Sequence, residues 1–255
     1  MFFVGFLSVF AGFVRFCCLS NFILTNSCPF IDFVRSFGRM PFMATGQLQT
    51  SLLIHLANGI AAGVQAIHTL TVAHRDIKSS HVLLKFSREG WPLPVISDFT
   101  TARTAYVPFF FNIQCLMVCD SDDEIATLAM GSSLRYASPQ VFAHIHDPTA
   151  SWSLEEDFAS DVFSVAVIFW ELLTRRVPWE NSTEVEIERS MFAERFLMVP
   201  QYTEIERFSL GELVKTIFTL DYTVRPTIDH VVEVLSRLAG NETTQPAFTT
   251  RSQLK

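Results

Sequence analysis

The sequence predicts a mainly helical α+β domain with a few short strands. Apolar residues recur at helical spacing between residues 50 and 68, and residues 162–173 are almost all apolar, which predicts two long helices. Two short apolar runs, 82–84 and 94–96, flank the turn 90–92 and predict a β-hairpin. With 255 residues, 49% of them hydrophobic, the chain can form one large packed domain or two small ones.

Residues 1–45 are predicted to lie outside the main domain. Phe2–Leu24 is nearly all apolar, with Arg15 inside the run. No basic region precedes it, as one would in a secretory signal, and a central arginine costs about 2.5–3.5 kcal/mol in a membrane span. Three interpretations are open: a membrane anchor, a vestigial lobe, or residues foreign to the natural protein, such as translated intron.

The next element is a helix that starts at Thr50 or Ser51, either of which can cap it, and runs to about His68. The small residues Gly59 and Gly63 would let another element approach this helix closely. Five aliphatic residues at helical spacing define its buried face: Leu53, Leu56, Ile60, Val64 and Ile67.

A charged loop follows this helix. Within Ala73–Lys85, the residues His74, Arg75, Asp76 and Lys78 stand almost next to one another. Buried charges cost several kcal/mol unless they are paired, so a fold keeps such a cluster for a site.

A second carboxylate, Asp98, ends the strand-like run 94–96, and the hairpin would place it at a loop end beside Asp76. Two loop carboxylates with Lys78 between them in sequence suit chemistry on a phosphate. One carboxylate can orient a hydroxyl, the other can hold a cation, and the lysine can neutralise developing charge.

Five short motifs, in order along the chain, resemble those of eukaryotic protein kinases. They are His74-Arg75-Asp76-Ile77-Lys78 (catalytic loop), Asp98-Phe99-Thr100 (metal-binding triplet), Ser138-Pro139-Gln140 (end of the activation segment), 161–173 (buried central helix) and Arg225-Pro226. Lys78, two residues after Asp76, resembles the serine/threonine branch rather than the tyrosine branch, and the chain as a whole resembles the serine/threonine or tyrosine-kinase-like branch. The resemblance covers about residues 46–240 and implies the kinase large lobe, mainly α (α+β) with short β-hairpins.

The resemblance implies ATP-dependent phosphoryl transfer to a serine or threonine hydroxyl of a protein. Asp76 would orient the acceptor hydroxyl, Lys78 would stabilise the transferring group, and Asp98 would bind the Mg²⁺ that bridges the nucleotide phosphates. His81 replaces the family's metal-binding asparagine. Imidazole is a poor ligand for Mg²⁺ and suits Mn²⁺ or Zn²⁺ better.

Supporting roles are implied for residues around the catalytic loop. His74 and Phe99 are expected to be structural. Asp161 would cap backbone N–H groups of the loop, although a simple helix N-cap explains the same residue. Arg75 would pair with a phosphorylated residue of the activation segment, and the candidates are Thr127, Ser132 and Ser133, with unmodified surface hydroxyls as the alternative.

Two further departures from the family pattern weaken the expected site. Gln140 replaces a glutamate that would pair with Arg225, so the remaining hydrogen bond should be weaker. Thr100 replaces the glycine of the metal-binding triplet, and a β-branched residue in a strained backbone region costs about 1–3 kcal/mol.

The family's small lobe has no counterpart in these residues. No Gly-x-Gly-x-x-Gly run occurs, the first lysine is Lys78, and the first 75 residues contain no glutamate. A glycine-rich loop and a small-lobe Lys–Glu pair therefore cannot be built from them, and ATP binds between the two lobes. The expected fold is a large lobe whose N-terminal lobe is absent or vestigial.

The remaining chain carries a few signals. The activation-segment equivalent, 98–140, is long and has an apolar insert at 105–119. Thr183 and Glu186 predict a capping box for a further helix. A last helix from about Thr227 is expected to bury Ile228, Val231, Leu235 and Leu238. The polar tail, 241–255, is predicted to be disordered.

Two functions are left open. The first is a serine/threonine kinase-like phosphotransferase with impaired activity, which would use ATP with Mg²⁺ or Mn²⁺ to phosphorylate protein substrates. The second is a pseudokinase or truncated kinase that binds another protein. The net charge of −7 argues against nucleic acid as a partner. Five cysteines without a Cys-x-x-Cys pair predict reduced thiols and a cytoplasmic location, with membrane anchoring through residues 2–24 as the alternative.

Overall fold

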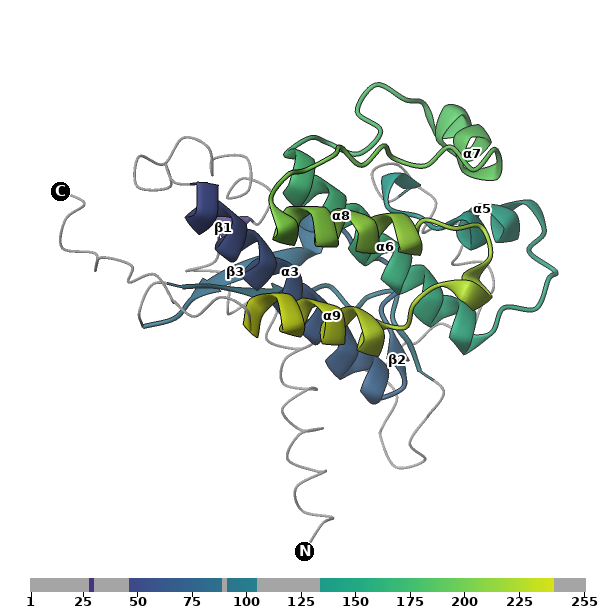
Figure 1. Ribbon diagram of the computed structural model, residues 1–255. Helices are drawn as coiled ribbons and strands as arrows, with labels where there is room; N and C mark the ends of the chain where they lie inside the picture. The colour runs from purple at the N-terminus through teal and green to yellow at the C-terminus, as the bar shows by residue number, and fades with distance from the viewer. Residues whose placement is uncertain (1–27, 30–45, 89–90, 105–133, 241–255) are drawn as a thin grey trace, which may run out of the picture.

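The computed structural model describes residues 28–29, 46–88, 91–104 and 134–240. The helices are α3 (Gly46–Thr69), α5 (Pro139–His146), α6 (Leu154–Thr174), α7 (Glu184–Phe192), α8 (Ile205–Ile217) and α9 (Ile228–Gly240). The strands are β1 (Cys28–Pro29), β2 (Val72–Ala73), β3 (Val82–Phe86), β4 (Pro92–Ile96) and β5 (Arg103–Thr104), and two 3-10 turns are η4 (Ser79–His81) and η7 (Tyr222–Val224). The prediction of a mainly helical fold with short strands is confirmed (Figure 1).

Helix α6 is the centre of the core. Every residue from Ser160 to Leu173 is buried, as expected for a helix that is apolar on all sides. A capping box of Ser153 and Glu156 starts the helix, and Arg175, in the left-handed conformation, ends it. Helices α3, α5 and α8 pack against it, which fixes the position of the site residues on its first half.

Helix α3 packs against α9 along one side and against the hairpin on another (Figure 1). The five aliphatic residues predicted for its buried face are all buried: Leu53, Leu56, Ile60, Val64 and Ile67. The predicted close approach also occurs. A Cβ at Gly59 would lie 2.6 Å from Pro94 Cγ, and one at Gly63 would lie 3.0 Å from Ile96 Cγ1.

The predicted hairpin is the antiparallel pair β3–β4, with Val82 opposite Ile96. Strand β1 pairs with the other edge of β3, so Cys28–Pro29 of the predicted outer segment belongs to this sheet. A second, two-stranded sheet joins β2 to β5, with Ala73 opposite Arg103. It was absent from the sequence prediction because two-residue strands carry no periodicity. It holds the start of the charged loop against the chain that follows Asp98.

The last predicted helices are present. Thr183 and Glu186 form the capping box that begins α7. Helix α9 buries Ile228, Val231 and Leu235, whereas Leu238 is half-buried against the core. Helices α5 and α8 were not predicted.

Several predictions fall on residues outside the described ranges: the apolar run 2–24, the insert 105–119, the hydroxyls at 127, 132 and 133, and the tail 241–255. Among the described helices, only Thr50–Thr69 of α3 is long and apolar enough to cross a membrane by length and composition, with a mean hydropathy of 1.3. Over half of that window is buried inside the domain, and any apolar core helix passes the same test.

Candidate functional site

The charged loop between β2 and η4 is fixed to helix α6 by one carboxylate. Asp161 is buried and accepts hydrogen bonds from the backbone N–H groups of His74 (2.7 Å) and Arg75 (2.8 Å). His68, at the end of α3, contacts the same carboxylate through Nε2 at 2.9 Å. The predicted capping of the loop by Asp161 is therefore confirmed. The alternative of a simple N-cap does not hold, because α6 begins earlier, at Leu154.

His74 is fully buried beneath the loop. Its Nε2 lies 3.1 Å from the Ser97 carbonyl oxygen, and its Nδ1 accepts from the Asp76 N–H at 3.3 Å. A carbonyl can only accept and an amide N–H can only donate, so the neutral Nε2–H tautomer satisfies both contacts. Burial lowers the pKa of His74, although the charge of Asp161 opposes this. The Phe99 ring packs on His74 at 4.8 Å between centroids, in keeping with structural roles for both.

Asp76 and Lys78 form a close ion pair. Lys78 Nζ donates to Asp76 Oδ2 at 2.8 Å, and both side chains are mostly buried. The pair lies in the loop that directly precedes η4, so a group presented at this edge would meet a carboxylate and an ammonium together. This arrangement can orient a hydroxyl and offset negative charge at one place.

His81 lies between the two predicted carboxylates. Its Nδ1 donates to the Asp76 carbonyl oxygen at 2.9 Å and is 3.5 Å from Asp76 Oδ2, while its Nε2 is 3.2 Å from Asp98 Oδ2. The expected approach of Asp76 and Asp98 is thus confirmed, with one imidazole touching both. One ring nitrogen of His81 therefore faces the backbone of the charged loop, and the other faces the Asp98 carboxylate.

Asp98 has a left-handed backbone, with φ of 64°. Its Oδ1 accepts from the Thr100 hydroxyl at 2.8 Å and from the Thr100 N–H at 3.4 Å. Burial opposes ionisation of Asp98, but the Thr100 hydrogen bonds and the His81 charge outweigh it and lower its pKa. The strain expected at Thr100 does not arise, because Thr100 is not among the described residues with positive φ. The strained residue is Asp98 itself.

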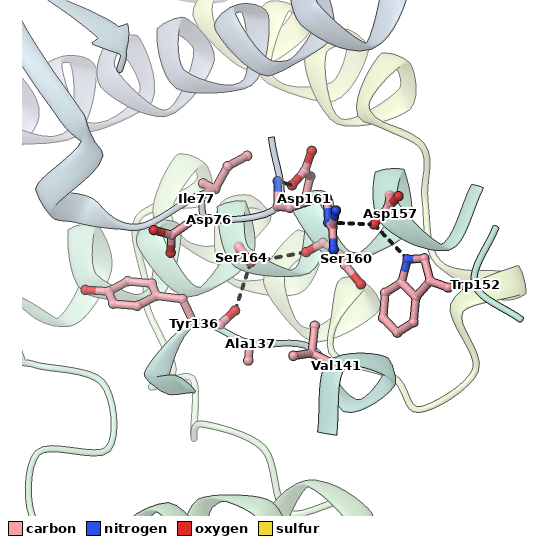
Figure 2. Close-up of a pocket in the computed structure, with 11 residues that line it drawn as sticks. Asp76, Ile77, Tyr136, Ala137, Val141, Trp152, Asp157, Ser160, Asp161 and Ser164 are labelled. Carbon is pink, nitrogen blue, oxygen red and sulfur yellow. Dashed lines mark hydrogen bonds and ion pairs between the residues drawn. The ribbon is translucent and has the colours of Figure 1, made fainter. Parts of the chain in front are cut away.

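Arg75 pairs with a residue that the sequence analysis missed. Its Nε lies 3.4 Å from Asp157 Oδ1, and Asp157 also accepts from Arg103 Nη1 (3.2 Å) and from Trp152 Nε1 (2.7 Å). Figure 2 shows Trp152 and Asp157 pointing toward each other at one end of a small pocket. Asp157 stands in the acidic first turn of α6, where the helix dipole already explains a carboxylate, so no separate sequence signal marks it.

A second missed network lies on the other side of the loop. The Ser79 hydroxyl is 2.8 Å from the Tyr136 hydroxyl, which donates to the buried Glu171 at 3.0 Å. Burial raises the pKa of Tyr136. These contacts join the loop to helix α6 through the segment that precedes α5.

The Arg225–Gln140 contact is separate from the carboxylate cluster. Arg225 Nη2 donates to Gln140 Oε1 at 3.1 Å, and the same guanidinium donates to the carbonyls of Ala159 and Thr219. Burial lowers the pKa of Arg225 to about 10, although the charge of Asp221 opposes this. The predicted hydrogen bond between a charged and a neutral group is present.

The described ranges contain no group of three or more His, Cys, Asp or Glu side chains that could hold a metal ion. Asp98 and His81 are close enough to contribute to one, but further ligands would have to come from elsewhere, such as phosphate oxygens. Ser133 lies outside the described ranges.

Comparison with known proteins agrees with this geometry. The protein kinase domain family matches residues 32–235, well over half of the chain, so the chain belongs to that family. It is similar to the serine/threonine-protein kinases STY17 and STY46 of Arabidopsis thaliana, with 22% and 24% identity over 76% of this chain and 28% of each relative. It is also similar to a mitogen-activated protein kinase kinase kinase of Drosophila melanogaster, with 25% identity over 86% of this chain and 17% of the relative. The chain thus spans less than a third of the length of these curated relatives.

Proposed function

We propose that this chain carries a serine/threonine kinase-type phosphoryl-transfer centre whose use of Mg²⁺ is impaired. Its reaction would transfer the terminal phosphoryl group of ATP to a hydroxyl of a protein substrate. The observation that carries the proposal is the position of His81 between Asp76 and Asp98, because an imidazole there occupies the space in which a cation would be held.

Asp76 and Lys78 support the transfer function. The carboxylate of Asp76 would orient the acceptor hydroxyl and take its proton, and the ammonium of Lys78, 2.8 Å away, would stabilise the charge of the transferring group. Asp161 and the neutral His74 hold this loop through buried hydrogen bonds to its backbone N–H groups. These contacts pre-position Asp76 and Lys78.

Asp98 would be the ligand for the divalent cation, and its surroundings support the impairment. One of its oxygens accepts from Thr100 and the other faces His81, so a cation must displace or share both contacts. Mg²⁺ demands near-octahedral oxygen coordination, whereas Mn²⁺ accepts imidazole more readily. We therefore expect weak activity with Mg²⁺ and a relative preference for Mn²⁺.

The test is a gain of function. Purified His81→Asn and wild-type chains are compared for ATP-induced thermal stabilisation and for phosphate transfer to a generic protein substrate, each with Mg²⁺ and with Mn²⁺. His81→Asn is expected to improve the Mg²⁺-dependent response on the order of tenfold or more, as for changes around a metal ligand. Asp98→Ala should abolish the response in both backgrounds. An equal or weaker Mg²⁺ response in His81→Asn would refute the proposed impairment.

The second candidate is a protein-binding module. Large apolar side chains at the turn end of the β3–β4 hairpin favour it, since Phe86 is 49% exposed and Leu93 is 42% exposed. The same experiment separates the two candidates. A chain that shows no nucleotide response with either cation, before or after the His81→Asn change, supports the binding module instead.

A further inference from the structure

Three donors from three segments converge on the buried carboxylate of Asp157. Arg75 comes from the charged loop, Arg103 from β5, and Trp152 from the connection before α6. Asp157 is only 1% exposed, and Arg75 is 11% exposed. Two guanidinium groups that approach one point from different segments form the geometry by which proteins recognise phosphate and carboxylate groups.

A small cavity of about 40 Å³ adjoins this cluster (Figure 2). Asp157 and Trp152 line one end of it, and Asp76 and Tyr136 lie at the other. The remaining nearby carboxylate, Asp161, is engaged by two backbone N–H groups and by His68. Asp157 is therefore the carboxylate that offsets the charge of the two arginines.

Stability alone does not explain this arrangement. Burial raises the pKa of Asp157 even though Arg75 and Arg103 act in the opposite direction, so the ionised carboxylate is costly to keep in place. The contacts instead fix geometry. Arg75 has a left-handed backbone (φ 68°) directly before Asp76, and Arg103 lies opposite Ala73, where the loop begins.

We propose that Asp157 is a built-in anion: its carboxylate fills the site between Arg75 and Arg103 that would otherwise bind a phosphate group, and so positions the Asp76 loop without one. Asp157 is a positioning residue, and its relevance to catalysis rests on the proposed function. The charge arithmetic is simple, since two guanidinium groups and one carboxylate leave a single positive charge, and removal of the carboxylate leaves two.

The test replaces the carboxylate and asks whether an external anion takes its place. Asp157→Ala removes the carboxylate and vacates its space, and it should lower the melting temperature by roughly 6 °C or more. Inorganic phosphate at constant ionic strength should recover a large part of that loss in Asp157→Ala and change the wild type little. The double variant Asp157→Ala/Arg103→Gln should lose the phosphate response. Asp157→Glu should restore the melting temperature in part.

Glu180→Ala is the control, because it also removes one carboxylate, at an exposed position. It should change neither the melting temperature nor the phosphate response. If Asp157→Ala gives no folded protein, the double variant Arg75→Gln/Asp157→Asn, which removes both charges and keeps the volume, should fold and melt higher.

The proposal fails if phosphate stabilises the wild type as much as Asp157→Ala, if Asp157→Ala shows no phosphate response, or if both double variants behave like Asp157→Ala. None of these measurements contains nucleotide. A phosphate response of the expected pattern in a chain without transfer activity would therefore refute the proposed function alone.

Discussion

Arg225 and Gln140 form a buried contact between a full charge and a neutral amide, with Nη2 and Oε1 separated by 3.1 Å. No salt bridge to Arg225 is formed by the residues that the structure describes, and its Nε has no hydrogen-bond partner there. The guanidinium is instead surrounded by two carbonyls and by the Phe163 ring, 5.1 Å away. An unpaired buried charge is costly, so a substitution at Gln140 that pairs the charge of Arg225 should raise the stability of the fold.

We expect Gln140→Glu to raise the free energy of unfolding by about 1–2 kcal/mol near neutral pH. The new carboxylate would accept a charge-assisted bond from Arg225, and this gain outweighs the lost amide hydrogen bond to the Leu220 carbonyl. Since pairing lowers the pKa of the introduced carboxyl, the gain is present above the unfolded value of about 4.3 and is lost as the pH falls through the folded value. Urea unfolding measures it.

Gln140→Met is the control for this change, because it fills a similar volume and removes both hydrogen bonds. It should lower stability by about 1–3 kcal/mol. A Gln140→Glu chain that unfolds at the same or a lower urea concentration than the wild type would show that the carbonyl contacts already satisfy Arg225.

Gly59 leads to a prediction about packing. A Cβ at this position would lie 2.6 Å from Cγ and 2.9 Å from Cδ of Pro94, whose ring is rigid. Gly59→Ala gains up to about 1 kcal/mol of helix propensity, but overpacking against β4 costs about 1–3 kcal/mol. We expect a lower melting temperature. Gly240→Ala, at the end of α9 with open space around it, should be within about 0.5 kcal/mol of the wild type. A Gly59→Ala chain as stable as the wild type would mean that the β3–β4 hairpin shifts enough to accommodate the added methyl group.

The sequence predicted the elements whose periodicity is strong. The buried face of α3 and the uninterrupted apolar run of α6 follow from helical spacing, and the hairpin follows from two apolar runs around a turn. Helix α8 was missed because charged and small residues interrupt its apolar face, and the pair β2–β5 because it is too short for any pattern. The elements that were predicted correctly are therefore those with a strong local sequence pattern.

The same limit applies to the site. Asp76, Lys78 and Asp98 were found because they stand in motifs, and the predicted role of Asp161 could be checked directly against two N–H contacts. Asp157 could not be found, since its contacts with Arg75 and Arg103 join residues far apart in the sequence. The bridging position of His81 likewise depends on how the hairpin folds back, which a sequence pattern does not record.

The buried His74 predicts how stability depends on pH. Burial lowers its folded-state pKa below the unfolded value of about 6.5, and the contacts with Ser97 and Asp76 fit the neutral ring. As the pH falls below that unfolded value, the unfolded chain binds the proton first, so the free energy of unfolding decreases. The slope from one such group is at most about 1.4 kcal/mol per pH unit.

Urea unfolding between about pH 8 and about pH 5 should therefore show the wild type losing stability on the acid side of about pH 6.5. His74→Phe fills the site without a titrating group. It should be less stable at high pH, because the Ser97 carbonyl loses its donor, but its pH slope should be shallower by up to one proton. Equal slopes for His74→Phe and the wild type would show that His74 does not titrate as a buried neutral ring, and the acid sensitivity would then have to come from another group.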